Sequence, residues 1–368
     1  MEKRNREHII KLQKLLPKTP TMKISRNSLF SRPTCNDVAR LAGVSNATVS
    51  NVLNRSGAVP VSLKTRDRVM KAAAELGYER NRVAASLALG KAQTIGVVIA
   101  TIEGSFHATI LQGIEKKCAA LGYRVMLLFT NDLQSGTSHV NGLLGDCVTG
   151  LIVVGDFSVS EISNWCDTAA QQQTPVVLVD RPLLDKHVDC VSSDDRHGSL
   201  VATKYLVGLG HRRIAHLAGD LSQPAALNRC EGYRETLQKA GLIAEEIVTE
   251  DGSYRSEAFC RAVTKLLEPS VRPTAVFAAT DFHASVVLQI ALHRGLRVPG
   301  DLAVMGYGDT ETSRAMSLTS VSQNAEQMGV IAVERLLTRL STPSLPPDEL
   351  IVTTRLVVRN SCGTSVDI

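Results

Sequence analysis

The sequence predicts a mixed α/β protein in which a small all-helical head precedes a two-lobed α/β core with parallel sheets. Two observations predict this architecture. Three short segments with helix caps and helical apolar spacing lie between residues 34 and 80. Beyond them, apolar runs of six to eight residues alternate with helix-length segments, first from 94 to about 190 and again from about 195 to 317. Such alternation is typical of parallel sheets covered by helices on both faces.

The head is expected to hold three helices. Residues 37–42 suit a short helix, Gly43 permits the left-handed turn that follows, and Ser45 is placed to cap the next helix. Ser62 is placed to cap a third helix, which keeps Lys64, Arg66, Arg68 and Lys71 outside. The apolar seam consists of Ala39, Ala42, Val44, Val49 and Val52 in the first pair and Leu63, Val69, Ala72, Ala73 and Leu76 in the third helix.

The core is expected to contain seven buried strands, at residues 94–100, 123–130, 150–155, 175–180, 213–219, 275–280 and 302–308. Their grouping into two sets predicts two similar lobes. Ligands of open parallel sheets bind outside the carboxyl ends of the strands, so we expect a ligand cleft between the lobes. The first lobe is expected to comprise about residues 92–192 and 323–336, and the second about 193–322 and 337–362.

Composition and cysteine spacing exclude several classes of protein. No apolar stretch approaches the ~20 residues of a membrane span, and the N-terminus lacks the apolar run of a secretory signal. A cytoplasmic location is therefore expected. The eight cysteines are scattered without a CxxC or Cys/His cluster, which argues against a disulfide framework and a zinc site. No metal or other cofactor is expected.

Charge is distributed unevenly along the chain. Residues 1–91 hold 18 Lys and Arg against 6 Asp and Glu, a net +12, whereas the rest holds 23 against 30, a net −7. A basic head on a mildly acidic body is typical of a nucleic-acid binder, because Lys and Arg neutralise phosphates. A merely solvated surface is the alternative. Residues 1–33 are basic, are interrupted by Pro17 and Pro20, and are expected to form a disordered arm.

The stretch DVARLAGVSNATVSNVLN, residues 37–54, has the character of a helix-turn-helix. In that motif the second helix enters the major groove of DNA with its N-terminal side chains against base edges. The alternative, an ordinary helical hairpin in a larger core, would not expect a run of polar groups in basic surroundings. The exposed positions of the second helix are Asn46, Ala47, Thr48, Ser50, Asn51 and Asn54. We therefore predict double-stranded DNA as a partner.

Residues 34–362 resemble the LacI/GalR family of bacterial transcription regulators. The matching segments of the head are DVARLAGVSNATVSNVLN, VSLKTRDRV and AAELGYERNRVAASLA. Those of the core include TIGVV, GLIVVG, LGHRRIAHLAG, NRCEGYRE, PTAVFAATD, RGLRVPGDLAVMGY and LVVRNS. The resemblance implies a helix-turn-helix DNA-binding domain at 34–80, a hinge helix and linker at 81–91, and a periplasmic-binding-protein-like core at 92–368.

For the head, the resemblance implies two kinds of DNA contact. Side chains expected to read bases are Asn46, Ala47 and Asn51, and those expected to contact phosphates are Thr48, Ser50 and Asn54. Asn51 stands where an Arg is common in the family, which predicts an operator sequence unlike the usual ones.

The resemblance also implies a hinge that folds on DNA. Residues from Asn81 to Ala88 would form this hinge helix, with Leu87 as the apolar wedge that opens a minor-groove step. Arg80 stands where a Pro is usual before the hinge.

For the core, the resemblance implies an effector site that takes a sugar, nucleobase or related small metabolite. Arg229 in NRCEGYRE matches the family's effector-binding arginine, whose planar fork suits a carboxylate or paired hydroxyls. Gly308 departs from the family, because an Asp that holds sugar hydroxyls often stands there, and Asp309 is shifted by one residue. The other expected contacts are Asp180, Thr280, Asp281 and Gln323. Each of these four could instead be a strand-end cap or part of a structural ion pair.

Together these features predict an allosteric repressor that binds a near-palindromic operator as a homodimer. No leucine heptad follows VVRNS, which favours a dimer over a tetramer. The alternatives are a solute-binding sensor without a specific operator and an enzyme on the same scaffold. The enzyme is disfavoured because no dinucleotide-binding loop, P-loop or G-x-S-x-G motif occurs. His107, His211 and His216 read as ordinary polar residues near strand ends.

Overall fold

The computed structural model describes residues 33–53, 61–78, 93–100, 105–130, 133–145, 148–155, 157–181, 188–248, 257–270 and 272–363. The chain forms two compact units, Met1–Leu89 and Gly90–Ile368. We call the described part of the first unit the head and that of the second the body, and we describe each by itself.

The head holds three helices, α2 (Cys35–Ala42), α3 (Asn46–Leu53) and α4 (Leu63–Glu75). Thr34 and Asp37 form a capping box at the start of α2, and Gly43 ends that helix in the left-handed region at φ 62°. Ser45 and Ser62 accept hydrogen bonds from backbone N–H groups in the first turns of α3 and α4. The three helices share one apolar core that includes Val38, Val49 and Val69. The predicted helices, turn and caps are therefore confirmed.

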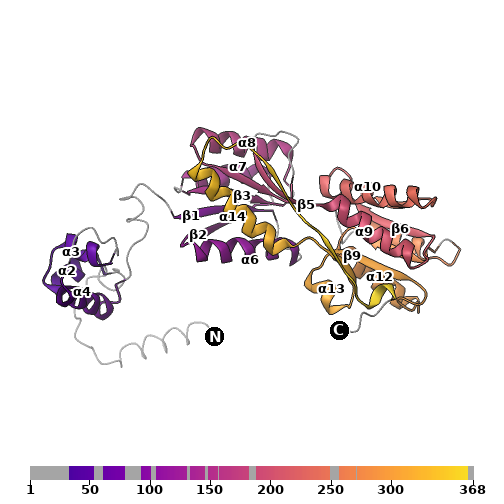
Figure 1. Ribbon diagram of the computed structural model, residues 1–368, viewed down its shortest axis with the longest axis horizontal. Helices are drawn as coiled ribbons and strands as arrows, with labels where there is room; N and C mark the ends of the chain where they lie inside the picture. The colour runs from indigo at the N-terminus through magenta and orange to yellow at the C-terminus, as the bar shows by residue number, and fades with distance from the viewer. Residues whose placement is uncertain are drawn as a thin grey trace, which may run out of the picture. The chain divides into compact units, whose positions relative to one another are not determined.

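The first lobe of the body is built on a six-stranded parallel sheet with the order β11-β5-β4-β3-β1-β2 (Figure 1). Helices α6 (Ser105–Ala120) and α14 (Ala325–Ser341) pack on one face, and α7 (Leu133–Gly145) and α8 (Val159–Gln171) on the other. The strands are β1 (Thr94–Ile99), β2 (Arg124–Phe129), β3 (Gly150–Val154), β4 (Val176–Val179), β5 (Asp189–Ser193) and β11 (Glu349–Val352).

The second lobe has a six-stranded sheet with the order β12-β10-β9-β8-β6-β7, in which β12 alone runs antiparallel to its neighbour. Helices α9 (Asp195–Gly208) and α10 (Pro224–Lys239) cover one face, and α11 (Glu257–Leu266) and α12 (Asp281–His293) the other. The strands are β6 (Ile214–Gly219), β7 (Glu245–Val248), β8 (Ala275–Ala278), β9 (Ala303–Gly308), β10 (Thr319–Ser322) and β12 (Arg355–Val357). The short elements α13 (Glu311–Ala315) and η1 (Asn360–Cys362) complete it.

Three crossovers join the lobes, from β5 to α9, from β10 to α14 and from β11 to β12. They are bonded to one another. Asp194 N donates to Val352 O at 3.0 Å, and Gln323 Nε2 donates to Ser193 Oγ at 2.9 Å. Asn324 Nδ2 donates to Thr353 O at 2.7 Å. Because each crossover follows the carboxyl end of a strand of one lobe or the other, these ends face the opposite lobe.

All seven predicted strands are present, and five further strands were not predicted. These are β5, β7, β10, β11 and β12, all of three to five residues, and each holds at least one polar or charged side chain. One predicted lobe boundary is wrong. Residues 337–362 were expected in the second lobe, but α14 runs to Ser341 in the first, and β11 pairs in parallel with β5 there. Only β12 and η1 return to the second lobe, because the chain crosses between Val352 and Arg355.

Cysteine chemistry agrees with the absence of a disulfide framework. Every cysteine that the structure describes carries a free thiol. Burial raises the pKa of Cys118 and of Cys362 to about 11, so these thiols pack as small apolar groups. In the same described ranges, no helix has both the length and the apolar character that a bilayer crossing requires.

Candidate functional site

The head exposes the N-terminal half of α3. Asn46, Ala47 and Ser50 are exposed, and Thr48 and Asn51 are half-buried, while Val49 and Val52 face the core. This division of faces leaves one polar side of α3 open to a ligand. The structure therefore brings the predicted residues of α3 to one surface, with the exception of Asn54, which lies outside the described residues.

The start of α3 is tied to the start of α2. Asn46 Nδ2 donates to Asn36 Oδ1, and Ser45 Oγ lies 2.9 Å from Thr48 Oγ1. The left-handed Gly43 is needed between them, because a Cβ at φ 62° would be strained. Asn36 was missed by the sequence analysis, because nothing in the pattern of α2 shows that its N-terminus meets that of α3.

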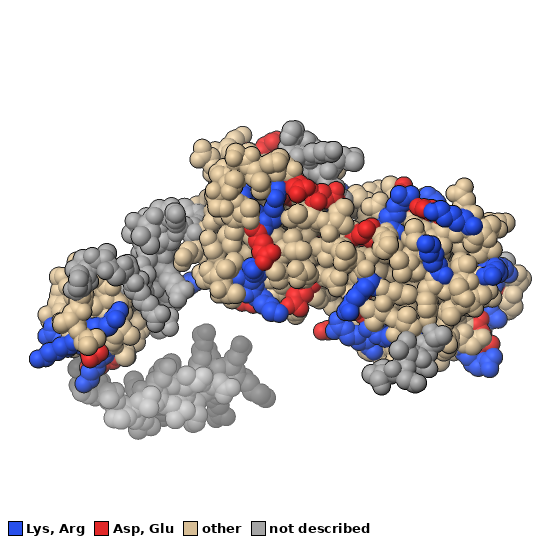
Figure 2. All heavy atoms as spheres, in the orientation of Figure 1, with Lys and Arg blue, Asp and Glu red and all other residues tan. Residues whose placement is uncertain are grey.

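The head also exposes several basic side chains. Arg40 on α2 and Lys64, Arg66, Arg68 and Lys71 on α4 are all exposed. Figure 2 shows Lys and Arg atoms gathered on the head, against few Asp and Glu atoms. Exposed cations beside a polar helix face suit a polyanion, because phosphates are neutralised around the groups that read bases. The predicted hinge residues Asn81 and Leu87 lie outside the described residues.

In the body, Arg229 of α10 is held rigidly at the carboxyl end of the second sheet. Its Nε donates to Asp195 Oδ1 at 2.8 Å, and its Nη1 donates to Ala279 O at 2.8 Å. The guanidinium lies 4.2 Å from the centre of the Tyr307 ring. Burial acts to lower its pKa, but the Asp195 carboxylate and its other neighbours hold the pKa above the ordinary value. Arg229 is only 7% exposed, and its guanidinium is fixed by Asp195, Ala279 O and the Tyr307 ring.

Asp281 is engaged inside the protein. Its Oδ1 accepts from Ser320 Oγ at 2.5 Å, and its Oδ2 accepts from both Thr310 N and Thr310 Oγ1 at 2.7 Å. Burial raises its pKa, although these hydrogen bonds act in the opposite direction. The neighbouring Thr280 caps α12 through His283 N. Both predicted residues thus shape the strand ends next to Arg229, and Asp281 fixes the loop that follows β9.

The loop after β9 provides no free carboxylate in place of the missing acid. Gly308 adopts φ 123°, where a side chain would be strained. Asp309 turns to Arg359, with Oδ1 accepting from Nη2 at 2.6 Å. The shift by one residue therefore takes the carboxylate into an ion pair with the last segment of the second lobe.

The other two predicted residues lie in the first lobe and in a crossover. Asp180 follows β4 with φ 65°, and its Oδ2 lies 4.0 Å from His107 Nε2 of α6. Gln323 is 2% exposed and bonds to Ser193 across two crossovers. Asp180 and Arg229 thus come from opposite lobes, as an interlobe site requires, whereas Gln323 is part of the hinge.

A cavity of ≈ 220 Å³ lies between the lobes. Its walls come from the ends of β4 and β5, from β11, and from the first turns of α9 and α10. Of the predicted site residues, Asp180 lines this cavity. Asp195, which accepts the hydrogen bond from Arg229, also lines it. Residues that the sequence analysis missed are Ser192, Asp194, Asp195, Arg196, Asn228 and Glu349. They could not be found, because β5 and β11 were not predicted as strands.

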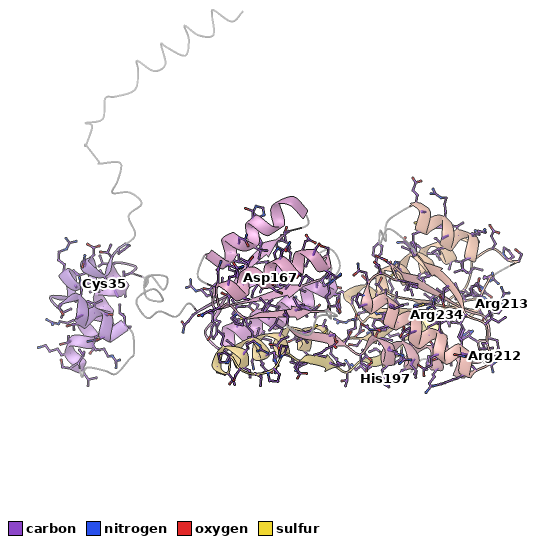
Figure 3. All side chains as sticks on the ribbon, turned by 90° about the horizontal axis from the view of Figure 1, so that it is seen from above. Cys35, Asp167, His197, Arg212, Arg213 and Arg234 are labelled. Carbon is purple, nitrogen blue, oxygen red and sulfur yellow. The ribbon has the colours of Figure 1, made fainter. Side chains whose placement is uncertain are left out.

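Some charged groups of the second lobe lie away from this cavity. Arg212 and Arg213 precede β6, at the amino end of the sheet, and Figure 3 shows them at the end of the second lobe remote from the first. Arg234 is paired with Glu246 Oε1 at 2.7 Å. Buried His216 donates from Nδ1 to Phe277 O at 2.9 Å, and burial lowers its pKa to about 4, so it is neutral.

Comparison with known proteins decides the family. Residues 34–81 match bacterial regulatory proteins of the lacI family, and residues 203–362 match a periplasmic binding protein-like domain. The chain is 32% identical over 332 residues to the ribose operon repressor of Haemophilus influenzae, across 89% of this chain and 98% of that protein. The chain belongs to the lacI family. It is 30% identical over 335 residues to the HTH-type transcriptional repressor PurR of Histophilus somni, across 90% and 99% of the two chains.

Solved structures of lacI-family regulators agree. The lac repressor dimer bound to operator and the anti-inducer ONPF matches with a TM-score of 0.77 at 30% identity, across 90% of this chain and 99% of that one. The transcriptional regulator CelR in complex with cellobiose matches with a TM-score of 0.65 at 31% identity, across 90% and 100%. This lacI-family chain is therefore a DNA-binding transcriptional regulator with a ligand-binding domain, and the predicted fold class is confirmed.

Proposed function

We propose that the protein is a homodimeric repressor whose affinity for a specific operator is set by a small metabolite bound between its lobes. The observation that carries this proposal is the presence, in one chain, of a head that exposes the polar face of α3 and a body in which Arg229 is bonded to Asp195, a residue that lines an interlobe cavity. A solute sensor or an enzyme would not need an exposed DNA-binding face on α3.

In the proposed complex, Asn46, Ala47 and Asn51 read bases in the major groove, and Thr48 and Ser50 contact phosphates. The exposure of α3 and the exposed cations on α2 and α4 support this assignment. We extend it to Asn54 as a further phosphate contact, and to residues 81–88 as a hinge helix with Leu87 as the minor-groove wedge.

The effector we propose is a sugar, a sugar acid or a related polyhydroxy compound. The planar guanidinium of Arg229 suits a carboxylate or a pair of hydroxyls. Asp180 provides an acceptor from the opposite lobe, while Thr280, Asp281 and Gln323 line or support the site. Gly308 removes the carboxylate that would hold sugar hydroxyls from the second lobe, which favours a ligand with an acidic group over a neutral pyranose. Regulators of ribose and cellobiose are among the relatives by name, which supports the general class.

Exposed apolar side chains support the homodimer. β2 is an edge strand of the first sheet and exposes Met126, Leu127 and Phe129, the last by 47%. Phe282 and Met316 of the second lobe are each 38% exposed. Exposed apolar edges are normally covered in solution, and the lac repressor that this chain matches is a dimer. We propose that these surfaces pair across a twofold axis.

Substituting Asn46 with alanine is expected to weaken operator binding by about tenfold and to remove the base preference at one pair of symmetric positions, because a bidentate side-chain contact to a base is lost. Ser50→Ala is expected to weaken binding to all sequences alike. Fluorescence anisotropy with single-base operator variants measures both effects. Asn164→Ala, at an exposed position of α8 in the body, is the matched control. Unchanged base preference in Asn46→Ala would remove Asn46 from the reading surface.

Arg229→Lys tests the effector site without leaving Asp195 unpaired. Lysine retains the positive charge beside Asp195 but not the planar fork, so we expect the effector concentration for half-maximal operator release to rise at least tenfold, with effector-free operator affinity unchanged. The effector is first found by thermal-shift screening of sugars, sugar acids and nucleobases against the full chain. An unaltered response in Arg229→Lys would place the effector elsewhere. Loss of operator binding as well would indicate misfolding, which a melting curve would reveal.

A further inference from the structure

A hydrogen bond joins the two lobes at a point away from the crossovers. Arg181 Nη1 donates to Gln223 Oε1 at 2.7 Å. Arg181 follows β4 in the first lobe, and Gln223 immediately precedes α10 in the second. The bonds of Ser193, Gln323, Asn324 and Thr353 lie on the crossovers themselves. If the lobes rotate about the crossovers, the length of a hydrogen bond on a crossover changes little. A hydrogen bond between the lobes away from the crossovers must instead break or form.

The Gln223 side chain is used in an unusual way. It occupies the N-cap position of α10, where a side chain ordinarily accepts a hydrogen bond from its own helix, yet it makes no such bond. Pro224 at the first helical position has no N–H, so the start of α10 has one unpaired backbone donor fewer. The side-chain oxygen is thereby available to a residue of the other lobe.

The bond acts on the helix that carries Arg229. Six residues separate Gln223 from Arg229, about 9 Å along α10. α10 is packed tightly on α9, since a Cβ at Gly232 would lie 2.4 Å from Arg196 O. The helix pair and the sheet below it therefore move as one body. The hydrogen bond to Gln223 therefore also positions Arg229 on α10 relative to Asp180, which directly precedes Arg181 in the first lobe.

Burial strengthens the hydrogen bond between Arg181 and Gln223. Arg181 is 9% exposed and Gln223 is half-buried. Hydrogen bonds to a charged group in such surroundings are stronger than those between neutral groups. Breaking one changes the balance between two lobe arrangements by about tenfold.

We propose that Arg181 and Gln223 form an interlobe latch that positions α10 and sets how often the effector-free body adopts the lobe arrangement of this structure. Only the consequence of the latch rests on the function proposed above: the latch would set the fraction of protein that is ready to bind effector. Its test needs neither DNA nor effector, so the latch and the proposed function fail separately.

The test uses variants that move the latch in opposite directions. Gln223→Ser caps α10 but is too short to reach Arg181, so it opens the latch without weakening the helix. Gln223→Glu replaces a charge–dipole bond with an ion pair and closes it. Arg181→Met removes the donor at similar length. Gln238→Glu, exposed near the end of α10, adds the same charge away from the latch and is the matched control.

Distances between the lobes are measured by pulsed electron spin resonance on the full chain. Spin labels are placed at Asp167→Cys on α8 and Arg212→Cys beside β6, both exposed and on different lobes (Figure 3). The background lacks the accessible native thiols, such as exposed Cys260. Labelled protein is mixed with excess unlabelled protein, so that distances within one chain dominate.

We expect Gln223→Ser and Arg181→Met to reduce the ratio of the arrangement seen here to any other by about tenfold, and Gln223→Glu to increase it. Gln238→Glu should match the parent. Melting temperatures identify any variant that fails to fold. If Arg181→Met fails to fold, the distances in Gln223→Ser alone test the latch. Identical distance distributions for the parent and a folded Gln223→Ser would overturn the latch, as would equal shifts in Gln223→Glu and Gln238→Glu.

Discussion

Gly113→Ala is expected to destabilise the first lobe by about 3 kcal/mol, at the upper end of the cost of adding a methyl group to a packed interior. A Cβ at Gly113 of α6 would lie 2.0 Å from Glu326 O of α14. On the facing helix, a Cβ at Gly329 would lie 2.1 Å from Ile110 O. The obstacles are backbone atoms of a helix, which cannot rotate away, so the two helices must separate and loosen the core around Ile114 and Met328.

Urea unfolding measures this effect through Trp165, the single tryptophan of the chain. Trp165 is fully buried in the first lobe, on α8. Gly142→Ala on α7 is the matched control, because nothing lies within 4 Å of its added Cβ. That change should stabilise the lobe by up to about 1 kcal/mol, since alanine is the better helix former. Equal midpoints for Gly113→Ala and Gly142→Ala would contradict the close packing of α6 on α14.

Asp189→Asn is expected to destabilise the same lobe by about 3 kcal/mol at neutral pH, because it leaves two partly buried arginines without their buried carboxylate. Asp189 is 1% exposed. Its carboxylate accepts from Arg335 Nε at 2.9 Å, from Arg339 and from Asp348 N at 3.1 Å. Arg339 also donates to Leu345 O and Pro346 O. Asp189 therefore organises the return of the chain from α14 to β11.

The pH dependence gives this prediction a sign. Burial acts to raise the pKa of Asp189, but the hydrogen bonds from Arg339 and Arg335 outweigh it and hold the pKa below its ordinary value. Such a carboxylate contributes stability above its unfolded pKa of about 4 and loses it as the pH falls through the folded pKa. The difference between the parent and Asp189→Asn should thus be constant above about pH 5 and shrink in acid. Glu334→Gln, in a half-exposed pair on α14, should change the midpoint little. A difference that grows in acid would exclude this role.

The fold was predicted wherever burial determines the sequence pattern. β1, β3 and β8 are covered on both faces, and their apolar runs are visible without a structure. β5 (DCVSS) and β10 (TSVS) were missed, since their polar side chains are buried by hydrogen bonds at the crossovers instead of by apolar contact. Gly113 and Gly329 likewise read as weak points in helices, although close helix packing requires them.

Site residues were predicted by position better than by role. Arg229 lies at the strand ends as expected, but its partner Asp195 follows a strand that was not predicted. Asp281 and Asp309 could not be interpreted from sequence, because the direction of a carboxylate depends on groups far along the chain. For Asp281 these are Thr310 and Ser320, and for Asp309 it is Arg359. A family pattern marks the position of a side chain, whereas its hydrogen bonds determine what it can offer a ligand.

The most direct test of the regulator is a pair of binding isotherms on the full chain. One uses a duplex selected by the protein from a random double-stranded library, and the other an unrelated duplex of equal length, both at physiological salt. The account predicts a twofold-symmetric selected sequence, bound at least about 10³-fold more tightly than unrelated DNA, and released by a metabolite that raises the melting temperature of the protein. Equal affinity for both duplexes, with no sequence enriched by selection, would contradict it.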